Sequence, residues 1–221
     1  EGKPVNAFYG YVTNGIFQTQ EEVDNYAVQV SGGTAPGDIR FLDLDNNGVI
    51  NADDRTYIGN PFPEWSFSMN NSLTYGNFDL QIFLQGIAGN DIYNANRIWQ
   101  ESMSIPQNQI SKVLDRWRGE GTSNSMPRAV YSDPNMNVRH SDRFIEDGSY
   151  LRLKNLTLGY TLPTDLSRKA YLSNARLYLS AQNLFTLTRY SGFDPEVGAG
   201  GVDLGTYPVT RTVSLGLNIQ F

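Results

Sequence analysis

Residues 212–221 read TVSLGLNIQF, and apolar and polar side chains alternate without a break along this stretch. The apolar positions are Val213, Leu215, Leu217, Ile219 and Phe221, and the positions between them are Thr212, Ser214, Gly216, Asn218 and Gln220. Alternation with a period of two is typical of a β-strand whose two faces meet different surroundings. The stretch therefore predicts a strand with one apolar face and one face of small, neutral polar groups.

Four further segments of about ten residues repeat this pattern. They are residues 65–75, 77–86, 150–160 and 174–185, and a weaker sixth candidate covers residues 5–12. In residues 150–160, Tyr150 and Leu156 are assigned to the apolar face, which Arg152 and Lys154 interrupt. The polar faces carry Ser, Thr, Asn, Gln and Gly rather than Lys and Glu, which suits strands that line a water-filled lumen.

Aromatic side chains gather where these strands begin or end. They are Trp65, Tyr75, Tyr150, Tyr160, Phe185 and Phe221. Aromatic girdles at both membrane surfaces are typical of outer-membrane barrels. A soluble β-sandwich with aromatic ends to its core is the alternative.

The connections between the predicted strands alternate between short and long. The first two strands meet in a tight turn at residues 75–77, whereas long connections cover residues 13–64, 87–149 and 186–211. Membrane barrels have short periplasmic turns and long outer loops. The sequence therefore predicts an all-β fold, an antiparallel segment of a transmembrane β-barrel with these three connections as extracellular loops.

About six strands cannot close a transporter-sized barrel, and an isolated set would leave unpaired edges in lipid. We therefore expect residues 1–221 to be the C-terminal part of one larger barrel domain whose other strands lie upstream. The chain has no run of 18 apolar residues, so the sequence predicts no transmembrane helix.

Composition excludes several function classes. The chain has 17 basic and 23 acidic residues, a formal net charge of -6, which argues against a nucleic-acid partner. It has no cysteine, so disulfide and thiol chemistry are absent. His140 is the only histidine, which removes most catalytic triads and zinc sites. We expect no enzyme activity and assign no catalytic residue.

Residues 43–54 have the spacing of a calcium-binding loop. The candidate ligands are Asp43, Asp45, Asn47, the carbonyl of Val49, Asn51 and Asp54, with Gly48 at the sharp turn. Position 12 is Asp54 rather than the usual bidentate glutamate. We expect a structural Ca²⁺ ion here, and the alternative is a turn held only by hydrogen bonds from side chains to the backbone.

Two smaller sets of residues also carry functional hypotheses. The pattern of Ser214, Gly216, Ile219 and Phe221 resembles the terminal signal read by the machinery that assembles outer-membrane barrels. Among the loop aromatics, Tyr93, Trp99 and Trp117 are candidates for contact with ligand, because flat aromatic faces stack on sugar rings or hold peptide side chains. Packing within the loops is the alternative role for each.

Several stretches together resemble SusC/RagA-type TonB-dependent transporters of Bacteroidetes. These stretches are residues 8–11, 14–22, 37–45, 48–50, 54–55, 58–61, 78–80, 89–94, 150–160, 180–185, 207–208 and 211–212. The resemblance covers nearly the whole chain in order.

The resemblance implies an outer-membrane barrel of about 22 strands with a plugged lumen. It also implies an N-terminal plug domain and a TonB-contacting segment, both of which lie outside this chain. Its partners would be a SusD-like surface lipoprotein, the TonB complex and outer-membrane lipid, and its cargo would be oligosaccharides or peptides. A soluble extracellular calcium-binding β-sandwich module and a passive porin remain the alternatives.

Overall fold

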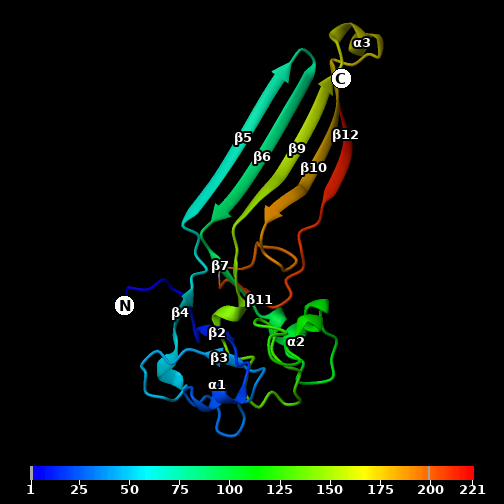
Figure 1. Cartoon of the computed structure of the whole chain (residues 1–221). Helices are drawn as coiled ribbons and strands as arrows, with labels where there is room; N and C mark the ends of the chain where they lie inside the picture. Colours follow the sequence, from blue (N-terminus) through cyan, green and yellow to red (C-terminus); the bar gives the residue numbers. More distant parts are fainter. Residues whose placement is uncertain (1, 199) are drawn as a thin grey trace. The chain divides into compact units, whose positions relative to one another are not determined.

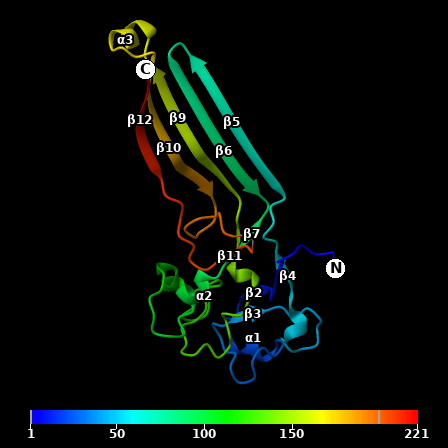
Figure 2. The same ribbon diagram turned by 180° about the vertical axis from the view of Figure 1, so that it is seen from behind.

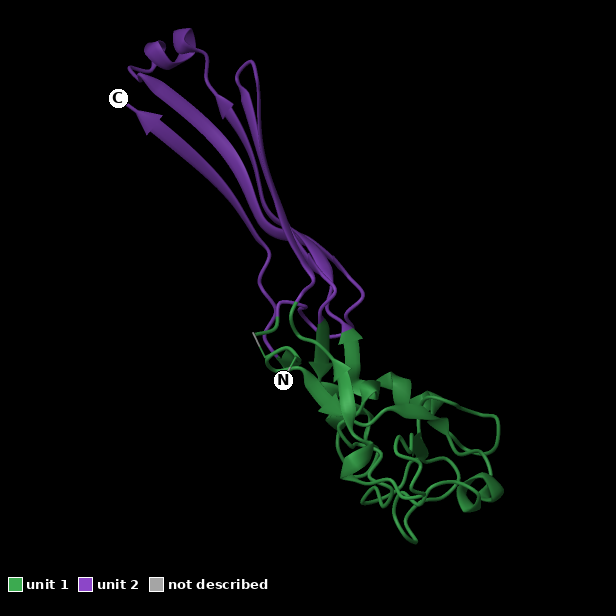
Figure 3. Cartoon of the chain, turned by 90° about the vertical axis from the view of Figure 1, so that its left-hand side faces the viewer, with its two compact units in different colours: residues 1–62, 91–146, 197–205 green, residues 63–90, 147–196, 206–221 purple. Residues whose placement is uncertain are grey.

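The computed structural model describes residues 2–198 and 200–221, and the chain divides into two compact units. Unit 1 comprises residues 1–62, 91–146 and 197–205, and unit 2 comprises residues 63–90, 147–196 and 206–221 (Figure 3). Most regular structure is β-strand. Within the described residues, no helix has the length and apolar character needed to cross a membrane.

Unit 2 is a sheet of five long antiparallel strands. They are β5 (Trp65–Tyr75), β6 (Phe78–Ala88), β9 (Tyr150–Thr161), β10 (Asn174–Thr188) and β12 (Thr212–Gln220). Their order in the sheet is β12-β10-β9-β6-β5, so every strand pairs with its neighbour along the chain in this set (Figures 1 and 2). The five long segments of alternating sequence are thus confirmed as strands.

Short connections join two of these strand pairs. Gly76 joins β5 to β6 with φ 58, the left-handed conformation that a two-residue hairpin turn needs at its first central position. The helix α3 (Thr164–Lys169) lies between β9 and β10. Because Tyr75 pairs with Phe78 and Trp65 with Ala88, the hairpin keeps one register along its whole length.

A bulge in β9 changes which residues share a face. Asn155 pairs with Phe83 of β6 while Leu153 pairs with the next residue, Leu84, so Lys154 is left without a partner position. The pairing of β9 with β10 is also irregular at this position, because the register shifts between Gln182 and Phe185 of β10. One extra residue reverses the alternation that precedes it.

The bulge corrects the faces expected from the sequence. Leu151 and Leu153 share the apolar face with Leu156, whereas Tyr150 and Arg152 lie on the polar face. The assignment of Tyr150 to the apolar face was therefore wrong. A prediction that assumes strict alternation along the strand cannot detect a bulge, because the extra residue changes the faces only in the folded sheet.

Unit 1 contains short strands and single helical turns. Strand β1 (Phe8–Gly10) pairs with β4 (Thr56–Gly59), and β2 (Thr13–Ile16) pairs with β3 (Ile39–Phe41). A third sheet has the order β11 (Val202–Asp203), β7 (Asp91–Asn94), β8 (Ile145–Asp147). The helices are α1 (Gln20–Asp24), α2 (Asn96–Glu101) and the 3-10 turns η1 (Ala52–Asp54), η2 (Ser111–Asp115) and η3 (Asp142–Phe144).

The sixth strand predicted from residues 5–12 does not extend the long sheet. Only residues 8–10 are a strand, and they pair with β4 inside unit 1. A Cβ atom added at Gly10 would lie 2.5 Å from the carbonyl oxygen of His140. This close backbone approach, together with the burial of Phe8, fixes the segment among the loops of unit 1.

Two apolar clusters and a buried polar network hold unit 1 together. Phe8, Tyr93, Ala95 and Phe144 form the first cluster, and Ile16, Ile39, Phe41 and Ile50 form the second. Long irregular segments leave backbone groups without ladder partners, so side chains must satisfy them. Gln29 accepts from the N–H of Phe41, and Asn137 accepts from the N–H of Ile39.

Candidate functional site

One face of the unit 2 sheet is covered with exposed apolar side chains. Trp65 is 72% exposed, Val213 65% and Leu215 73%, although each lies in the middle or at the start of a hydrogen-bonded strand. Cross-strand pairs such as Leu177 with Leu217 and Leu158 with Leu179 continue the apolar surface from strand to strand. An apolar band of this kind suits contact with lipid.

The opposite face of the sheet carries small polar groups and an ion pair between β10 and β6. The hydroxyls of Thr157 and Ser180 lie 3.2 Å apart on adjacent strands. Arg176 of β10 reaches over Gly159 of β9 to Asp79 of β6, with 2.9 Å between Nε and Oδ1. A Cβ atom at Gly159 would collide with this pair, so the glycine permits a bridge across three strands.

A second charged group anchors the segment that follows β10. The side chain of Arg152 is only 2% exposed, and its guanidinium donates to Asp194 at 2.7 Å and to the hydroxyl of Thr186 at 2.8 Å. Lys154 adds an ion pair with Glu196 at 2.6 Å. Both residues look like interruptions in the sequence, but the structure uses them to hold residues 194–196 to the polar face of β9.

The predicted calcium loop brings its acidic residues together. One carboxylate oxygen each of Asp43, Asp45 and Asp54 lie within 4.8 Å of one another. Asp54 is fully buried and accepts from the N–H groups of Leu44 and Asn51, both at 2.7 Å. Gly48 has φ 83, as the sharp turn requires. The donor atoms are hard oxygens, which fit a cation of the Ca²⁺ type.

The same loop also contains the alternative set of hydrogen bonds. Asn47 accepts from the N–H of Val49, and the side chain of Asn51 accepts from Asp53 to cap η1. Burial raises the pKa of Asp43, but hydrogen bonds from the backbone N–H groups of Gly48 and Asn47 outweigh this effect, so the pKa of Asp43 lies below its ordinary value. A cation bound among Asp43, Asp45 and Asp54 would reduce the repulsion between their side chains.

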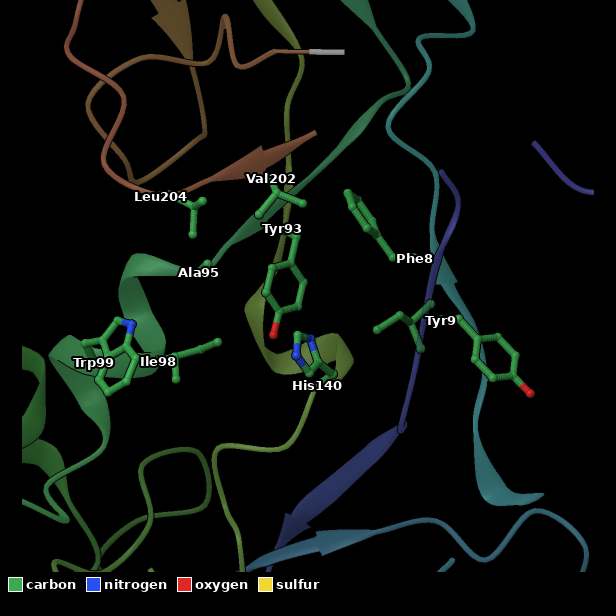
Figure 4. A pocket seen from close by; sticks show the side chains of 10 residues that line it. Phe8, Tyr9, Tyr93, Ala95, Ile98, Trp99, His140, Val202 and Leu204 are labelled. Carbon is green, nitrogen blue, oxygen red and sulfur yellow. The ribbon is translucent and has the colours of Figure 1, made fainter. Parts of the chain in front are cut away.

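Two of the three candidate ligand-binding aromatics meet at one pocket in unit 1. Tyr93 and Trp99 line a hollow of about 300 Å³, and Figure 4 shows side chains from several strands facing the same space. Trp117 lies elsewhere, packed against the second apolar cluster, and its Nε1 donates to Gln18 at 3.1 Å. The geometry of Trp117 is that of a packing residue.

The helix that carries Trp99 is fixed by a buried carboxylate that the sequence does not single out. Glu101 is 1% exposed and pairs with Arg97 at 2.8 Å, Arg143 at 2.9 Å and Lys112 at 3.3 Å. Burial raises the pKa of Glu101, yet the hydrogen bond and charge of Arg97 and the charge of Arg143 lower it below its ordinary value. Arg97 lies four residues before Glu101 on the same helix, but Lys112 and Arg143 come from separate segments, so spacing along the chain could not reveal these two partners.

The four residues of the predicted assembly signal lie on or just beyond β12. Ile219 is on the apolar face opposite Ala175, and Phe221 is 91% exposed. Gly216 lies under the ring of Tyr178, which would collide with any Cβ atom at this position. Ser214 pairs with Ser180 on the polar face.

Comparisons with known proteins agree with this architecture. No protein-family model matches the chain. It is 38% identical over 232 residues to TonB-dependent receptor P3 of Formosa agariphila, a match that covers 100% of the chain and 22% of that receptor. It is 28% identical over 214 residues to TonB-dependent receptor SusC of Bacteroides thetaiotaomicron, covering 96% of the chain and 20% of that receptor.

Solved structures give the same result. The RagAB peptide transporter matches with a TM-score of 0.78 and 26% identity, covering 97% of this chain and 22% of the matched chain. The RagAB peptide importer in its closed-closed state matches with a TM-score of 0.76, also at 26% identity. The chain spans about a fifth of the length of these relatives. The relatives are receptors and transporters rather than enzymes.

A β-barrel of this type explains why the unit 2 sheet is apolar on one face and polar on the other. Similarity extends over the whole chain, in sequence to SusC and in structure to RagAB, and we conclude that the chain belongs to the SusC/RagA-type TonB-dependent receptors.

Proposed function

We propose that the receptor containing this chain is an active importer that carries oligosaccharides or peptides across the outer membrane. TonB-dependent receptors are outer-membrane proteins, and the apolar face of the five-stranded sheet is the observation that carries the proposal. Energy would come from the TonB complex, which would contact a segment outside this chain. The relatives SusC and RagAB support this assignment over a passive porin.

Uptake measurements test the proposal directly. Cells that express the receptor are expected to accumulate labelled oligosaccharides or peptides, and cells that lack TonB are expected to lose this uptake. A passive porin would carry the same solutes equally well with and without TonB. Uptake that is independent of TonB would therefore replace the importer with the porin.

We also propose a SusD-like surface lipoprotein as the partner of the receptor. The similarity to SusC and to RagAB supports this partnership. Affinity purification of the full receptor from detergent-solubilised outer membranes should recover the lipoprotein in a fixed ratio. A receptor that purifies without any lipoprotein after gentle cross-linking of intact cells would contradict the proposal.

The orientation of the loops is a further part of the proposal. We place residues 13–64, 87–149 and 186–211 outside the cell and the β9–β10 connection in the periplasm. Because this chain has no cysteine, single substitutions can report on exposure. Leu114 is 63% exposed in unit 1 and Leu166 is 52% exposed in α3.

A membrane-impermeant maleimide applied to intact cells is expected to label Leu114→Cys and to leave Leu166→Cys unlabelled until the outer membrane is permeabilised. Any cysteines elsewhere in the receptor would first be replaced by serine. The reverse labelling pattern would place the three long segments in the periplasm.

For the loop of residues 43–54 we propose a structural Ca²⁺ ion. Three clustered carboxylates and the turn at Gly48 support this proposal, since a cation would remove the repulsion between them. Such an ion would stiffen the loop and would take no part in chemistry. Ca²⁺ is expected to protect this loop of the full receptor against proteolysis, and Asp45→Asn is expected to weaken that protection. Equal cleavage with Ca²⁺ and with a chelator would contradict the proposal.

We propose that Ser214, Gly216, Ile219 and Phe221 form the signal for barrel assembly. The exposed ring of Phe221 and its place directly after β12, which carries the other three residues, support this role. Phe221→Ala is expected to lower the amount of assembled receptor in the outer membrane, whereas Phe221→Tyr should preserve it. Equal assembly of the alanine variant would remove the signal from the proposal.

A further inference from the structure

A second hollow in unit 1 collects positive charge. It has a volume of about 520 Å³, within the range of small-molecule sites. Arg55, Arg139 and His140 line it together with the rings of Tyr9 and Tyr11. Among the described residues of this lining, none is an aspartate or a glutamate. The hollow therefore differs from the chain as a whole, whose formal net charge is -6, and it favours an anion.

Arg139 is half-buried but forms no ion pair within the described residues. Its Nη2 donates to the backbone carbonyls of Gln29 and Asn135, both at 3.3 Å. Its Nε and Nη1 make no hydrogen bond within residues 2–198 and 200–221, and they keep access to solvent. Burial lowers the pKa of Arg139, and the nearby Tyr11 and Asp133 do not restore it. An anion that reaches this guanidinium would compensate for its lost hydration.

Two other arginines of unit 1 with little exposure already have such an anion. Arg97 pairs with Glu101 at 2.8 Å, and Arg143 pairs with the same carboxylate at 2.9 Å. The chain supplies no carboxylate of this kind to Arg139 within the described residues. A carboxylate carried by a ligand would fill that place.

Arg55 provides a second guanidinium beside the same aromatic ring. Its Cζ lies 5.8 Å from the centroid of Tyr11, and the Cζ of Arg139 lies 5.4 Å from that centroid. Arg55 is exposed and forms no ion pair within residues 2–198 and 200–221. Arginine presents its N–H groups as a planar fork that matches the two oxygens of a carboxylate. The hollow thus offers two such forks to a carboxylate.

Tyr9 favours a sugar as the carrier of this carboxylate. Its ring lines the hollow and is 53% exposed, with its neighbour Tyr57 packed edge-on at 5.3 Å between centroids. The apolar face of a sugar ring can stack on an exposed aromatic face, whereas the acidic side chain of a peptide is flexible and has no flat face. The exposed imidazole of His140 adds a polar partner for the hydroxyls of the sugar.

We propose that this hollow binds an acidic sugar, whose carboxylate is held by Arg55 and Arg139 and whose ring stacks on Tyr9. The inference rests on the proposed importer function, and it narrows the cargo of the receptor to oligosaccharides that carry uronic acids.

Binding of defined probes to the detergent-solubilised full receptor tests the assignment. The acidic probes are tetrasaccharides of galacturonate, mannuronate and hyaluronan, and the methyl esters of the same tetrasaccharides are the uncharged controls. The peptide Gly-Gly-Glu-Gly-Gly, acetylated and amidated at its ends, carries one carboxylate without a sugar. Calorimetry gives the Kd of each probe.

At least one acidic tetrasaccharide is expected to bind at least about tenfold more tightly than its ester and than the peptide, because hydrogen bonds from guanidinium to carboxylate are charge-assisted. Rising NaCl concentration should reduce the preference for the acid over the ester, because salt screens the attraction.

Single variants separate the hollow from the rest of the receptor. Arg55→Gln and Arg139→Lys remove one fork each, and each should weaken binding of the acid about tenfold while leaving the ester unchanged. Tyr9→Ala should weaken the acid and the ester alike, because it removes only the stacking surface. Arg118→Gln removes the same charge at an exposed arginine outside the lining and should change nothing. Resistance to protease checks that unit 1 is folded in each variant.

The outcomes distinguish this inference from the importer function. A preference for the acid that survives both Arg55→Gln and Arg139→Lys would overturn the hollow as its binding site. Equal or tighter binding of the peptide, weakened by the same two variants, would overturn the sugar as the carrier. Equal binding of acids and esters, or no binding by any probe, would overturn the anion site. TonB-dependent uptake would then decide separately whether the receptor is an importer.

Discussion

The two units of this chain are built on opposite rules. In unit 2 the backbone satisfies itself through long strand ladders, and the side chains are left free to face lipid or lumen. In unit 1 the strands have two to four residues, so buried polar side chains satisfy much of the backbone. We therefore expect unit 2 to lose stability when a side chain is placed on the wrong face of the sheet. We expect unit 1 to lose stability when a buried polar group loses its partner.

The bulge at Lys154 offers the largest test of the rule for unit 2. Deleting Lys154 would restore an unbroken alternation in β9 and turn Arg152 toward the apolar face. It would also separate Arg152 from Asp194. We expect no assembled receptor in the outer membrane, measured by heat-modifiable mobility on gels.

Lys154→Ala is the matched control for this deletion. It removes the ion pair with Glu196 but keeps the number of residues in β9, so assembly should persist. Equal assembly of the deletion and of Lys154→Ala would show that the sheet absorbs the lost residue and that the bulge does not set the faces.

A buried ion pair gives the corresponding test for unit 1. Asp38 is fully buried and receives two hydrogen bonds from the guanidinium of Arg128, at 2.9 and 3.0 Å. Arg128→Met would leave this carboxylate without its charge partner, at a cost of about 3–5 kcal/mol. Limited proteolysis of the purified receptor should then cut within residues 91–146, while the sheet of unit 2 stays resistant.

Arg118→Met controls for the loss of a positive charge, because the hydrogen bond that Arg118 makes to the carbonyl of Leu114 is exposed. Its effect on the stability of unit 1 should stay within about 0.5 kcal/mol. Proteolysis of the Arg128→Met variant at the rate of the control would contradict the importance of the buried pair.

Arginine substitutions on the two faces of β10 distinguish the cost of placing a charge against lipid from the cost of adding a long side chain to the strand. Leu179 lies on the apolar face between Leu158 and Leu215, and Gln182 lies on the polar face between Asn155 and Thr212. Leu179→Arg is expected to destabilise the barrel by about 2–4 kcal/mol, and Gln182→Arg by much less. Urea unfolding in lipid vesicles measures both, and equal values would contradict the assignment of the faces.

The contrast between the units also explains how far the sequence could be interpreted. Alternation located all five long strands, because each has one apolar and one polar face over about ten residues. It failed at Lys154, since an extra residue leaves no mark on composition. It also misplaced residues 5–12, where alternation over three residues cannot distinguish a barrel strand from a loop strand.

The site was harder to predict because its residues meet only after folding. The acidic loop was found from spacing, since its candidate ligands lie within 12 residues of one another. The meeting of Tyr93, Trp99 and Leu204 at one pocket depends on the parallel pairing of β7 with β11, more than one hundred residues apart. No local pattern encodes that pairing, and the same holds for the ion pairs of Glu101 with Lys112 and Arg143.

The smallest expected effect is the acid sensitivity of unit 1 through Glu101. The pKa of this carboxyl is lower in the folded state, despite burial that raises it, because Arg97 and Arg143 stabilise its charged form. Its contribution to stability is therefore fully present above the ordinary carboxyl pKa, and it is lost as the pH falls through the lowered folded value. The thermal stability of unit 1, measured as resistance to protease, should decline in that acidic range.

Glu101→Gln should lower the stability of unit 1 at neutral pH and flatten this decline. Glu120→Gln, in the exposed loop after η2, should leave the dependence of stability on pH unchanged. A profile that stays equally steep in Glu101→Gln would assign the acid sensitivity to carboxylates other than Glu101.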